Sequence, residues 1–376
     1  MRRTFVLLLI MLWSANFCLN TSALPEEYRD FADAIPDDVA ELLPDRFFSD
    51  DATEISNALG ESLSPGYILG VVFDLLSGGM GDAFKLFAML TGLAVISSLL
   101  NSFADTVSGG NLKAAVSFGA AVCTATAAVS IQLPRIIAAG EFFRRICIVM
   151  NSMIPVMTAL YLSGGNTTGA ALASSSLLIQ INLIELCATA VVLPAVCACM
   201  ALTLADTLRT GEGSLSGIVG SIKHTLAFIF GLCSTLLMAS LSAQNILAAA
   251  SDNAGARAVK FVAGNMIPVV GSTVGESLRT LATSVKLLRS TVGVAGIVTV
   301  ALLLLPFIIG LFLTRFALNS AASVGEIIGC KSIVKLYREL ASLYGYIIAA
   351  AAMASLLCVL SLTLFALGST AIGGLS

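Results

Sequence analysis

Charged and catalytic side chains are scarce in this sequence. Only 11% of the 376 residues are charged, whereas an ordinary soluble domain has about a quarter. The single histidine, His224, excludes a histidine metal cluster within one chain, and it is the one candidate for a histidine-based triad. We therefore expect no catalytic residues, no metal and no cofactor, and a role that is not enzymatic.

The nine cysteines predict neither a zinc site nor a disulfide framework. After Cys18 nearly all of them lie in or beside apolar runs, where isolated cysteines behave as small hydrophobic side chains. Cys197 and Cys199 stand in the order C-x-C, which matches no common zinc motif. The cysteines therefore give no reason to expect a metal.

A stretch that resembles a phosphate-binding loop also fails on inspection. In "GEIIGCKS" (325–332), Cys330 stands where the second glycine of such a loop is required, and no buried strand precedes the stretch. We expect no nucleotide hydrolysis and no nucleic-acid partner.

Apolar residues are abundant, at 57% of the chain, and the mean hydropathy is +0.95. A run of roughly 20 apolar residues can cross a hydrocarbon core of about 30 Å. Six runs qualify: 86–104, 114–133, 146–163, 225–249, 292–314 and 346–368. The run 170–205 is either one long span with an interfacial piece or two short spans, and 64–79 is a weaker candidate. The sequence predicts an all-α polytopic membrane protein with six to nine transmembrane helices, in contact with the lipid bilayer.

The first residues predict export. Residues 1–23 contain Arg2 and Arg3, an apolar core and a small-residue end, which is the pattern of a signal peptide; a retained anchor helix is the alternative. Twelve acidic residues follow within 25–61, against only two arginines. We expect the segment 24–63 to lie outside the cytoplasm.

Apolar residues within that acidic segment recur at near-helical spacing and predict short amphipathic helices. The residues are Phe31, Ile35, Val39, Leu42 and Leu43. Such helices suit docking onto a partner or onto the membrane face of the protein itself, and a solvated spacer is the alternative.

An internal duplication is the best explanation for three recurring landmarks. "RRICIVMNSMIPVM" (144–157) matches "RAVKFVAGNMIPVV" (257–270), and Pro194 matches Pro306 at nearly the same offset. We predict two membrane repeats, 112–223 and 224–335. They are preceded by helices in 64–111 and followed by a C-terminal amphipathic end and last helix in 336–376. Convergent low complexity is the alternative.

The MIPV motif predicts a broken or re-entrant helix in each repeat, because proline removes a helix hydrogen bond and the freed carbonyl needs a partner within the membrane. The alternative is that the prolines only kink packed helices. The hinge or cavity candidates are Asn151, Pro155, Asn265, Pro268, Gly271 and Gly275.

Three polar residues, Gln180, Asn182 and Glu185, lie inside the apolar run 170–205. Ionisable groups at membrane depth are costly and face a protein interior or a water path. Glu185 is therefore a candidate for a conduit or for proton coupling; a polar seam between two short spans is the alternative.

Basic clusters do not alternate simply between the two sides of a membrane. We interpret 135–145, 209–223 and 315–338 as loops. The amphipathic stretches 276–290 and 331–344 predict helices that lie flat on the membrane or touch a cytoplasmic partner.

The stretch "KFVAGNMIPVVG" (260–271), after a signal-like start and an acidic segment, resembles the stage III sporulation protein AE family of endospore-forming bacteria. The resemblance implies a multi-pass protein in the mother-cell membrane around the forespore. It also implies a channel-like complex with other stage III membrane proteins, a secretion-type ATPase and ring-forming proteins, which supports late forespore development. Small residues are dense in the apolar runs and are compatible with a homo-oligomer. The alternative function is a stand-alone secondary transporter or permease, favoured by the duplication and by Glu185.

Overall fold

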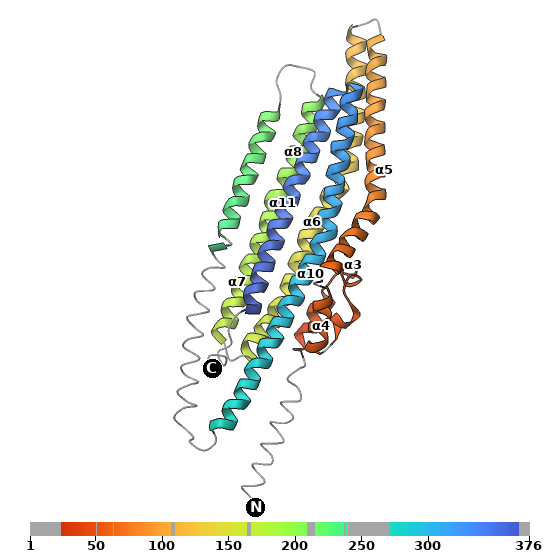
Figure 1. Cartoon of the computed structure of the whole chain (residues 1–376). Coiled ribbons are helices and arrows are strands. Elements are labelled where there is room, and N and C mark those ends of the chain that lie inside the picture. The colour runs from red at the N-terminus through yellow and green to blue at the C-terminus, as the bar shows by residue number, and fades with distance from the viewer. Residues whose placement is uncertain are drawn as a thin grey trace, which may run out of the picture.

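The computed structural model describes residues 24–49, 51–62, 64–106, 110–163, 167–208, 215–236, 238–239 and 271–367. The expected signal peptide and the second MIPV motif, with Asn265 and Pro268, lie outside these residues. Most of the described chain is helical, and the long helices lie side by side in one elongated bundle (Figure 1).

The elements divide into a small N-terminal group and the bundle. The small group comprises α2 (Glu27–Asp33), α3 (Asp37–Ala40), the 3-10 helix η1 (Asp45–Phe48) and α4 (Ala52–Ser62). The bundle comprises α5 (Pro65–Thr106), α6 (Gly110–Ser163), α7 (Thr167–Leu186), the π-helical segment η2 (Cys187–Val192), α8 (Leu193–Leu208), α10 (Gly271–Ile328) and α11 (Lys331–Leu367). A further helix, Ser216–Leu236, lies between α8 and α10 in the sequence.

Six helices of the described residues are long and apolar enough to cross a membrane. This finding confirms the all-α polytopic class and gives the low end of the expected range. The number is low because neighbouring apolar runs are continuous. The runs 64–79 and 86–104 both belong to α5, and the runs 114–133 and 146–163, expected as two spans, both belong to α6. The run 170–205 is one helical run from α7 through η2 to α8.

The expected loop at 135–145 is wrong, because this stretch lies inside α6. Its charged residues are good helix formers, and Phe142 within it stacks on Phe307 of α10 with ring centroids 4.0 Å apart. The stretches 276–290 and 331–344, expected as separate flat helices, instead belong to α10 and α11. Charge in these places lies within continuous helices and does not mark a break in them.

The expected break at Pro155 is also wrong. Helix α6 continues through Pro134 and Pro155 without interruption, so the alternative of a proline within a packed helix holds for the first MIPV motif. Gly271 begins α10 and Gly275 follows within it. The internal duplication stays a prediction, because much of its second half lies outside the described residues.

Helices α10 and α11 form an antiparallel pair joined by a short turn at Gly329, whose φ is 86°. Glycines on α10 allow the close approach: a Cβ on Gly293 would lie 2.6 Å from the Cβ of Ala366, and one on Gly296 would lie 3.1 Å from Leu362. In a bilayer the hydrophobic effect does not drive helices together, so van der Waals packing of this kind stabilises the helix pair.

Buried polar side chains tie α11 to its other neighbours. Tyr337 donates a hydrogen bond to the Leu90 carbonyl of α5 at 2.8 Å, and Tyr344 donates to Gln132 of α6 at 2.7 Å. At the far end of α11, the buried Arg289 of α10 donates to the Phe365 carbonyl at 3.0 Å. These contacts place α11 at the centre of the bundle.

The acidic segment folds into a small lobe, formed by α2 to α4 and called the acidic lobe here. Phe31, Ile35 and Val39 are buried, which confirms the predicted amphipathic helices, and the lobe contacts α6 and α10. Burial raises the pKa of Tyr28 above its ordinary value, so its hydroxyl stays protonated and donates to the Phe47 carbonyl. Docking onto the protein's own bundle is therefore the observed arrangement.

The π-helical segment η2 directly precedes Pro194, the second residue of α8. Proline lacks the N–H that a regular helix needs there, and a π turn is a common way to accommodate the missing bond. The sulfur of Cys187, the first residue of η2, lies 2.9 Å from the sulfur of Cys233 in the Ser216–Leu236 helix. Pro306 sits within the regular α10 helix, so the two paired prolines have different local structures.

The sulfur contact predicts that mild oxidation joins Cys187 to Cys233. Copper phenanthroline with oxygen should convert the two thiols of membrane-embedded protein into a disulfide. If a protease site is inserted within 209–214, the cleaved fragments should then stay together until reductant is added. The crosslink should be lost in Cys187→Ser and kept in Cys197→Ser, because Cys197 is exposed on α8. Fragments of the parent protein that separate without reductant would contradict this arrangement.

Candidate functional site

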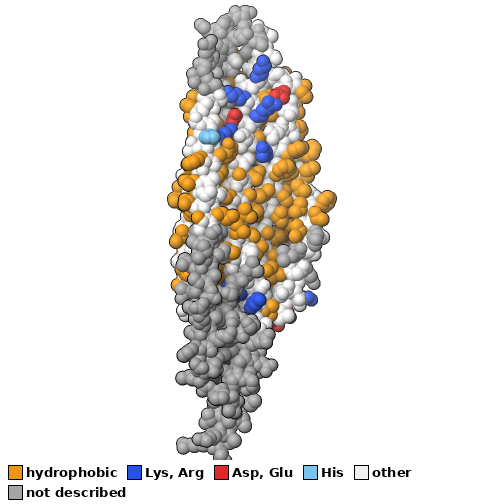
Figure 2. All heavy atoms as spheres, turned by 60° about the vertical axis from the view of Figure 1, so that its left-hand side comes forward, with side chains coloured by type: hydrophobic (Ala, Val, Ile, Leu, Met, Phe, Trp, Pro, Cys, Tyr) orange, Lys and Arg blue, Asp and Glu red, His pale blue; other side chains and the backbone are white. Residues whose placement is uncertain are grey.

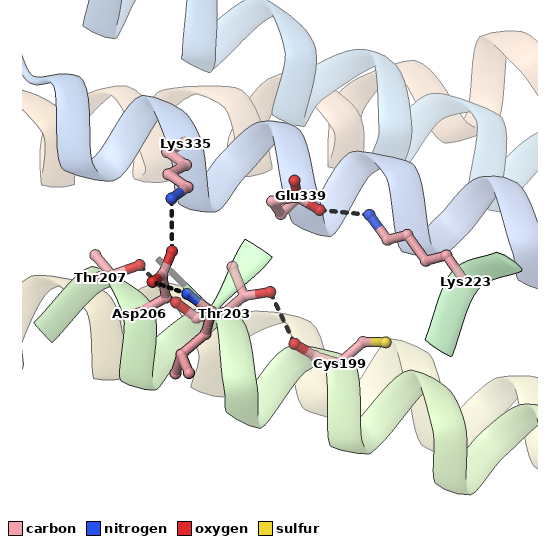
Figure 3. A network of polar contacts seen from close by, with 8 residues as sticks. Cys199, Thr203, Asp206, Thr207, Lys223, Lys335 and Glu339 are labelled. Carbon is pink, nitrogen blue, oxygen red and sulfur yellow. Dashed lines mark hydrogen bonds and ion pairs between the residues drawn. The ribbon is translucent and has the colours of Figure 1, made fainter. Parts of the chain in front are cut away.

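Charged side chains gather where α8, the Ser216–Leu236 helix and α11 meet at one end of the bundle (Figures 2 and 3). Asp206 of α8 accepts a bond of 2.5 Å from Lys335 of α11 and one of 2.7 Å from the Leu215 backbone N–H. The Asp206 side chain is only 7% exposed, whereas that of Lys335 is 45% exposed. The aspartate thus holds the start of the Ser216–Leu236 helix beside α11.

A second ion pair lies one helical turn further along α11. Lys223 pairs with Glu339 and donates to Ser342 at 2.9 Å, and Arg338 pairs with Glu326 of α10 at 2.6 Å. A surface hollow of about 480 Å³ adjoins these residues and is lined by Glu326, Gly329, Lys331, Val334, Lys335, Arg338 and Glu339. We call this group the charged end of the bundle.

Removing Lys335 should destabilise the protein more than removal of a surface lysine does. Lys335→Ala leaves the buried Asp206 carboxylate without this partner, which should lower the free energy of unfolding by about 1–3 kcal/mol. Asp206→Asn in the same chain should recover part of the loss, since it removes the charge. The midpoint of thermal unfolding in detergent measures both effects, with Lys331→Ala on the exposed side of the same helix as the control. Equal midpoints for Lys335→Ala and Lys331→Ala would contradict the role of the pair.

A second polar feature follows α6 and includes two residues singled out in the sequence. Glu141, Arg144, Ile148, Asn151 and Pro155 are all exposed, and steps of three and four residues place them on one helix face. We call this face the α6 stripe. Arg144 and Glu141 form an ion pair at 3.8 Å, with side chains 70% and 60% exposed.

The α6 stripe lies level with the apolar run of α10. A Cβ on Gly296 of α10 would lie 2.9 Å from the methyl group of Met153, and Phe142 stacks on Phe307. The part of α6 between these two contacts therefore runs beside residues 296–307, inside the apolar run 292–314. Charged residues of the stripe are thus at the depth that α10 would occupy in hydrocarbon.

Pro155 adds a backbone group to the α6 stripe. Because proline has no N–H, the carbonyl of Asn151 loses the donor that residue i+4 supplies in a regular helix. In a membrane this carbonyl requires water or another protein donor. Asn151 therefore contributes both an exposed amide and a carbonyl that needs a partner.

The acidic lobe borders one side of the α6 stripe. Arg145 pairs with Asp38 of α3 at 2.9 Å, so a carboxylate of the lobe reaches the same depth. Toward the N-terminal end of α6 from this point, a groove of about 300 Å³ lies between α5, α6 and α10. It is lined in part by Asp82, Arg135 and Pro306, which gives Pro306 a place beside polar side chains.

The structure separates the three polar residues of α7. Gln180 is buried and accepts a hydrogen bond from Ser361 of α11, so it serves helix packing. Asn182 and Glu185 are exposed, and the Asn182 amide donates to the Leu178 carbonyl at 2.8 Å. Glu185 lies within electrostatic range of Cys147 on α6, which places its carboxylate near the other side of the α6 stripe.

The sequence interpretation found Asn151, Pro155 and Glu185 but missed the charged partners around them. Glu141 and Arg144 lie in the stretch that was interpreted as a loop, and Lys335 and Glu339 lie in one interpreted as a flat helix. The spacing of Lys335 and Glu339, four residues apart on one face, was the available signal for the charged end.

Together, the six long apolar helices of the described residues and the hydrophobic surface over the middle of the bundle define a polytopic helical membrane protein (Figure 2). A family model described as Stage III sporulation protein AE matches residues 52–369. The chain belongs to that family, which confirms the resemblance seen in the sequence and gives the protein a role in sporulation.

A relative from Bacillus subtilis (strain 168), called Stage III sporulation protein AE, is 26% identical over 190 residues. The match covers 49% of this chain and 47% of the relative, so it spans about half the length of each protein. No solved structure matches the chain.

Proposed function

We propose that this protein is a non-enzymatic membrane subunit of a channel or export-type complex. The complex connects mother cell and forespore during endospore formation and is needed for late forespore development. The observation that carries the proposal is the α6 stripe, where Glu141 and Arg144 are exposed at the depth of apolar helices. A membrane protein that works alone in lipid gains nothing from such a face, whereas a subunit that faces water or other proteins does.

The family membership supports the setting of this function. We place the protein in the mother-cell membrane around the forespore, with other stage III membrane proteins, a secretion-type ATPase and ring-forming proteins as partners. The charged end offers one contact surface for such partners, because Lys331, Lys335 and Arg338 are exposed on α11. A homo-oligomer agrees with the exposed helix faces.

A secondary transporter is the second candidate, and Glu185 is the observation in its favour. Its carboxylate is exposed on α7 five residues from Gln180, which bonds to Ser361 of α11, so it lies at membrane depth. A transporter should move substrate when it is purified alone and reconstituted. A complex subunit should co-purify with partners and show no transport without them.

Substitutions in the α6 stripe should impair sporulation without reducing the protein in the membrane. Arg144→Leu removes a charge that costs about 2.5–3.5 kcal/mol at the centre of a bilayer, so insertion should be as good as before or better. Asn151→Leu removes the exposed amide in the same way. Both should lower the yield of heat-resistant spores, whereas Phe228→Leu, on an exposed apolar position of another helix, should not. Wild-type spore yield in both stripe variants would contradict the proposed role of the stripe.

The acidic lobe should lie outside the cytoplasm and the charged end inside it. Basic residues concentrate on the cytoplasmic side, and the lysines and arginine of the charged end lie toward the opposite end of the bundle from the lobe (Figure 1). A reporter enzyme that is active only outside the cytoplasm should be active when fused after Ser62 and inactive when fused within 209–214. The reverse pattern, with both fusions intact, would overturn this orientation.

A further inference from the structure

The α6 stripe contains two kinds of group that are costly in hydrocarbon: the charged side chains of Glu141 and Arg144, and a backbone carbonyl that has no helix donor. Arg144 is 70% exposed, and Pro155 leaves the Asn151 carbonyl without its i+4 donor. Neither group can be left in hydrocarbon at low cost. The environment of the stripe must therefore supply hydrogen bonds along its length.

Polar groups border the α6 stripe on both sides. On one side Arg145 pairs with Asp38 of the acidic lobe. On the other side Cys147 lies against the Ile181 carbonyl of α7, and Glu185 is within electrostatic range of the same cysteine. The stripe thus lies between two carboxylates, that of Asp38 on one side and that of Glu185 on the other.

The side of α6 that faces α10 is different from the stripe. It contacts α10 through Phe142 and Met153, and the groove of about 300 Å³ on that side is lined mostly by apolar residues, with Asp82, Arg135 and Thr314 among them. The stripe, on the opposite face of the same helix, therefore does not contact α10.

Another face of the bundle differs at the same depth. Leu356 of α11 is 58% exposed, and it lies six residues from Leu362, which packs beside Gly296. The space-filling view of the side with the Ser216–Leu236 helix shows hydrophobic side chains over the middle of the bundle, a group of charged ones in the upper part and a few charged ones lower down (Figure 2). Lipid can contact that apolar face directly. At the same membrane depth, the bundle therefore has an apolar face and, at the α6 stripe, a polar one.

We propose that the α6 stripe forms one wall of a water-filled path through the membrane, which admits small hydrated ions and polar solutes. This inference rests on the proposed function, since a complex has to supply the remaining walls. Water meets every requirement of the stripe at once: it hydrates the Glu141 and Arg144 pair, bonds the amide of Asn151 and satisfies its carbonyl. The acidic lobe borders the path at the depth of Asp38.

Cysteine accessibility tests the path in sporulating cells that express the full-length chain. Cys123 and Cys197, the exposed cysteines among the residues that the structure describes, are first replaced by serine, and labelling of this parent is the baseline. Ile148→Cys then places a thiol in the stripe at a position that is 44% exposed and already apolar, and Leu356→Cys is the matched control at the same depth. The reagents are membrane-impermeant methanethiosulfonates, one cationic and one anionic, which react with the thiolate that forms in water.

The expected result is that Ile148→Cys reacts at least about tenfold faster than Leu356→Cys with at least one reagent, because only a hydrated thiol ionises readily. Asn151→Cys, a second stripe position, should react like Ile148→Cys and guards against one variant that fails to fold. Membrane abundance and spore yield are measured in the same strains.

If both stripe variants insert at the abundance of the parent but react as slowly as Leu356→Cys, and the Ile148→Cys strain still forms spores, the water path is wrong and the proposed function still stands. If the stripe is labelled but loss of the protein leaves spore yield unchanged, the path stands and the proposed function fails. Labelling of Leu356→Cys as fast as of Ile148→Cys would also overturn the path, because the two faces would then not differ.

Discussion

The close packing of α10 against α11 is the contact on which the rest of the structure depends. At Gly293 a Cβ would clash with Ala366 of α11, and at Gly296 a Cβ would be in tight contact with Leu362 of the same helix. The gain in dispersion energy from this close packing needs no water to drive it. Helix α10 then supports α5, α6 and the acidic lobe, while α11 supports α8 and the charged end. Loss of fit between these two helices would therefore loosen both halves of the bundle.

Charge follows from the same constraint. A helix that packs through small and apolar residues must direct its charged residues to a helix end or to a face that lipid does not touch. Asp206 and Lys335 meet at an end, whereas Arg144 occupies a face of α6 at the depth of α10's apolar run. Arg289 shows the third solution: it is buried, lies over the ring of Tyr161 and bonds the Phe365 carbonyl at the end of α11.

The sequence was sufficient for the class of fold because apolar run length is a local property. It placed an apolar run in each of the six long helices, although it divided α6 into two spans, and it predicted the amphipathic helices of the acidic lobe. It could not predict that 135–145 continues as helix, since the stacking of Phe142 on Phe307, a contact between residues far apart in the sequence, is what keeps this charged stretch in the bundle.

The same limit applies to the candidate site. Gln180, Asn182 and Glu185 share one polar stretch, yet Gln180 turns inward to Ser361 and the other two turn outward. Which of these side chains is buried depends on where α11 packs against α7. The partners of Asp206 and of Arg145 likewise come from distant segments, so spacing along the chain gave no direct sign of them.

The acidic lobe has a consequence for the order of assembly. Its helix α4 ends at Ser62, but it packs on α10, which begins at Gly271 and is synthesised more than 200 residues later. At about 5–20 residues per second, translation reaches α10 roughly 10 to 40 s after the lobe has emerged. The side of α4 that packs on α10 must wait during that interval without its final neighbour. By contrast, α10 and α11 are consecutive and can meet as soon as they are made. The last-made helix pair thus completes the docking site of the first-made part of the chain.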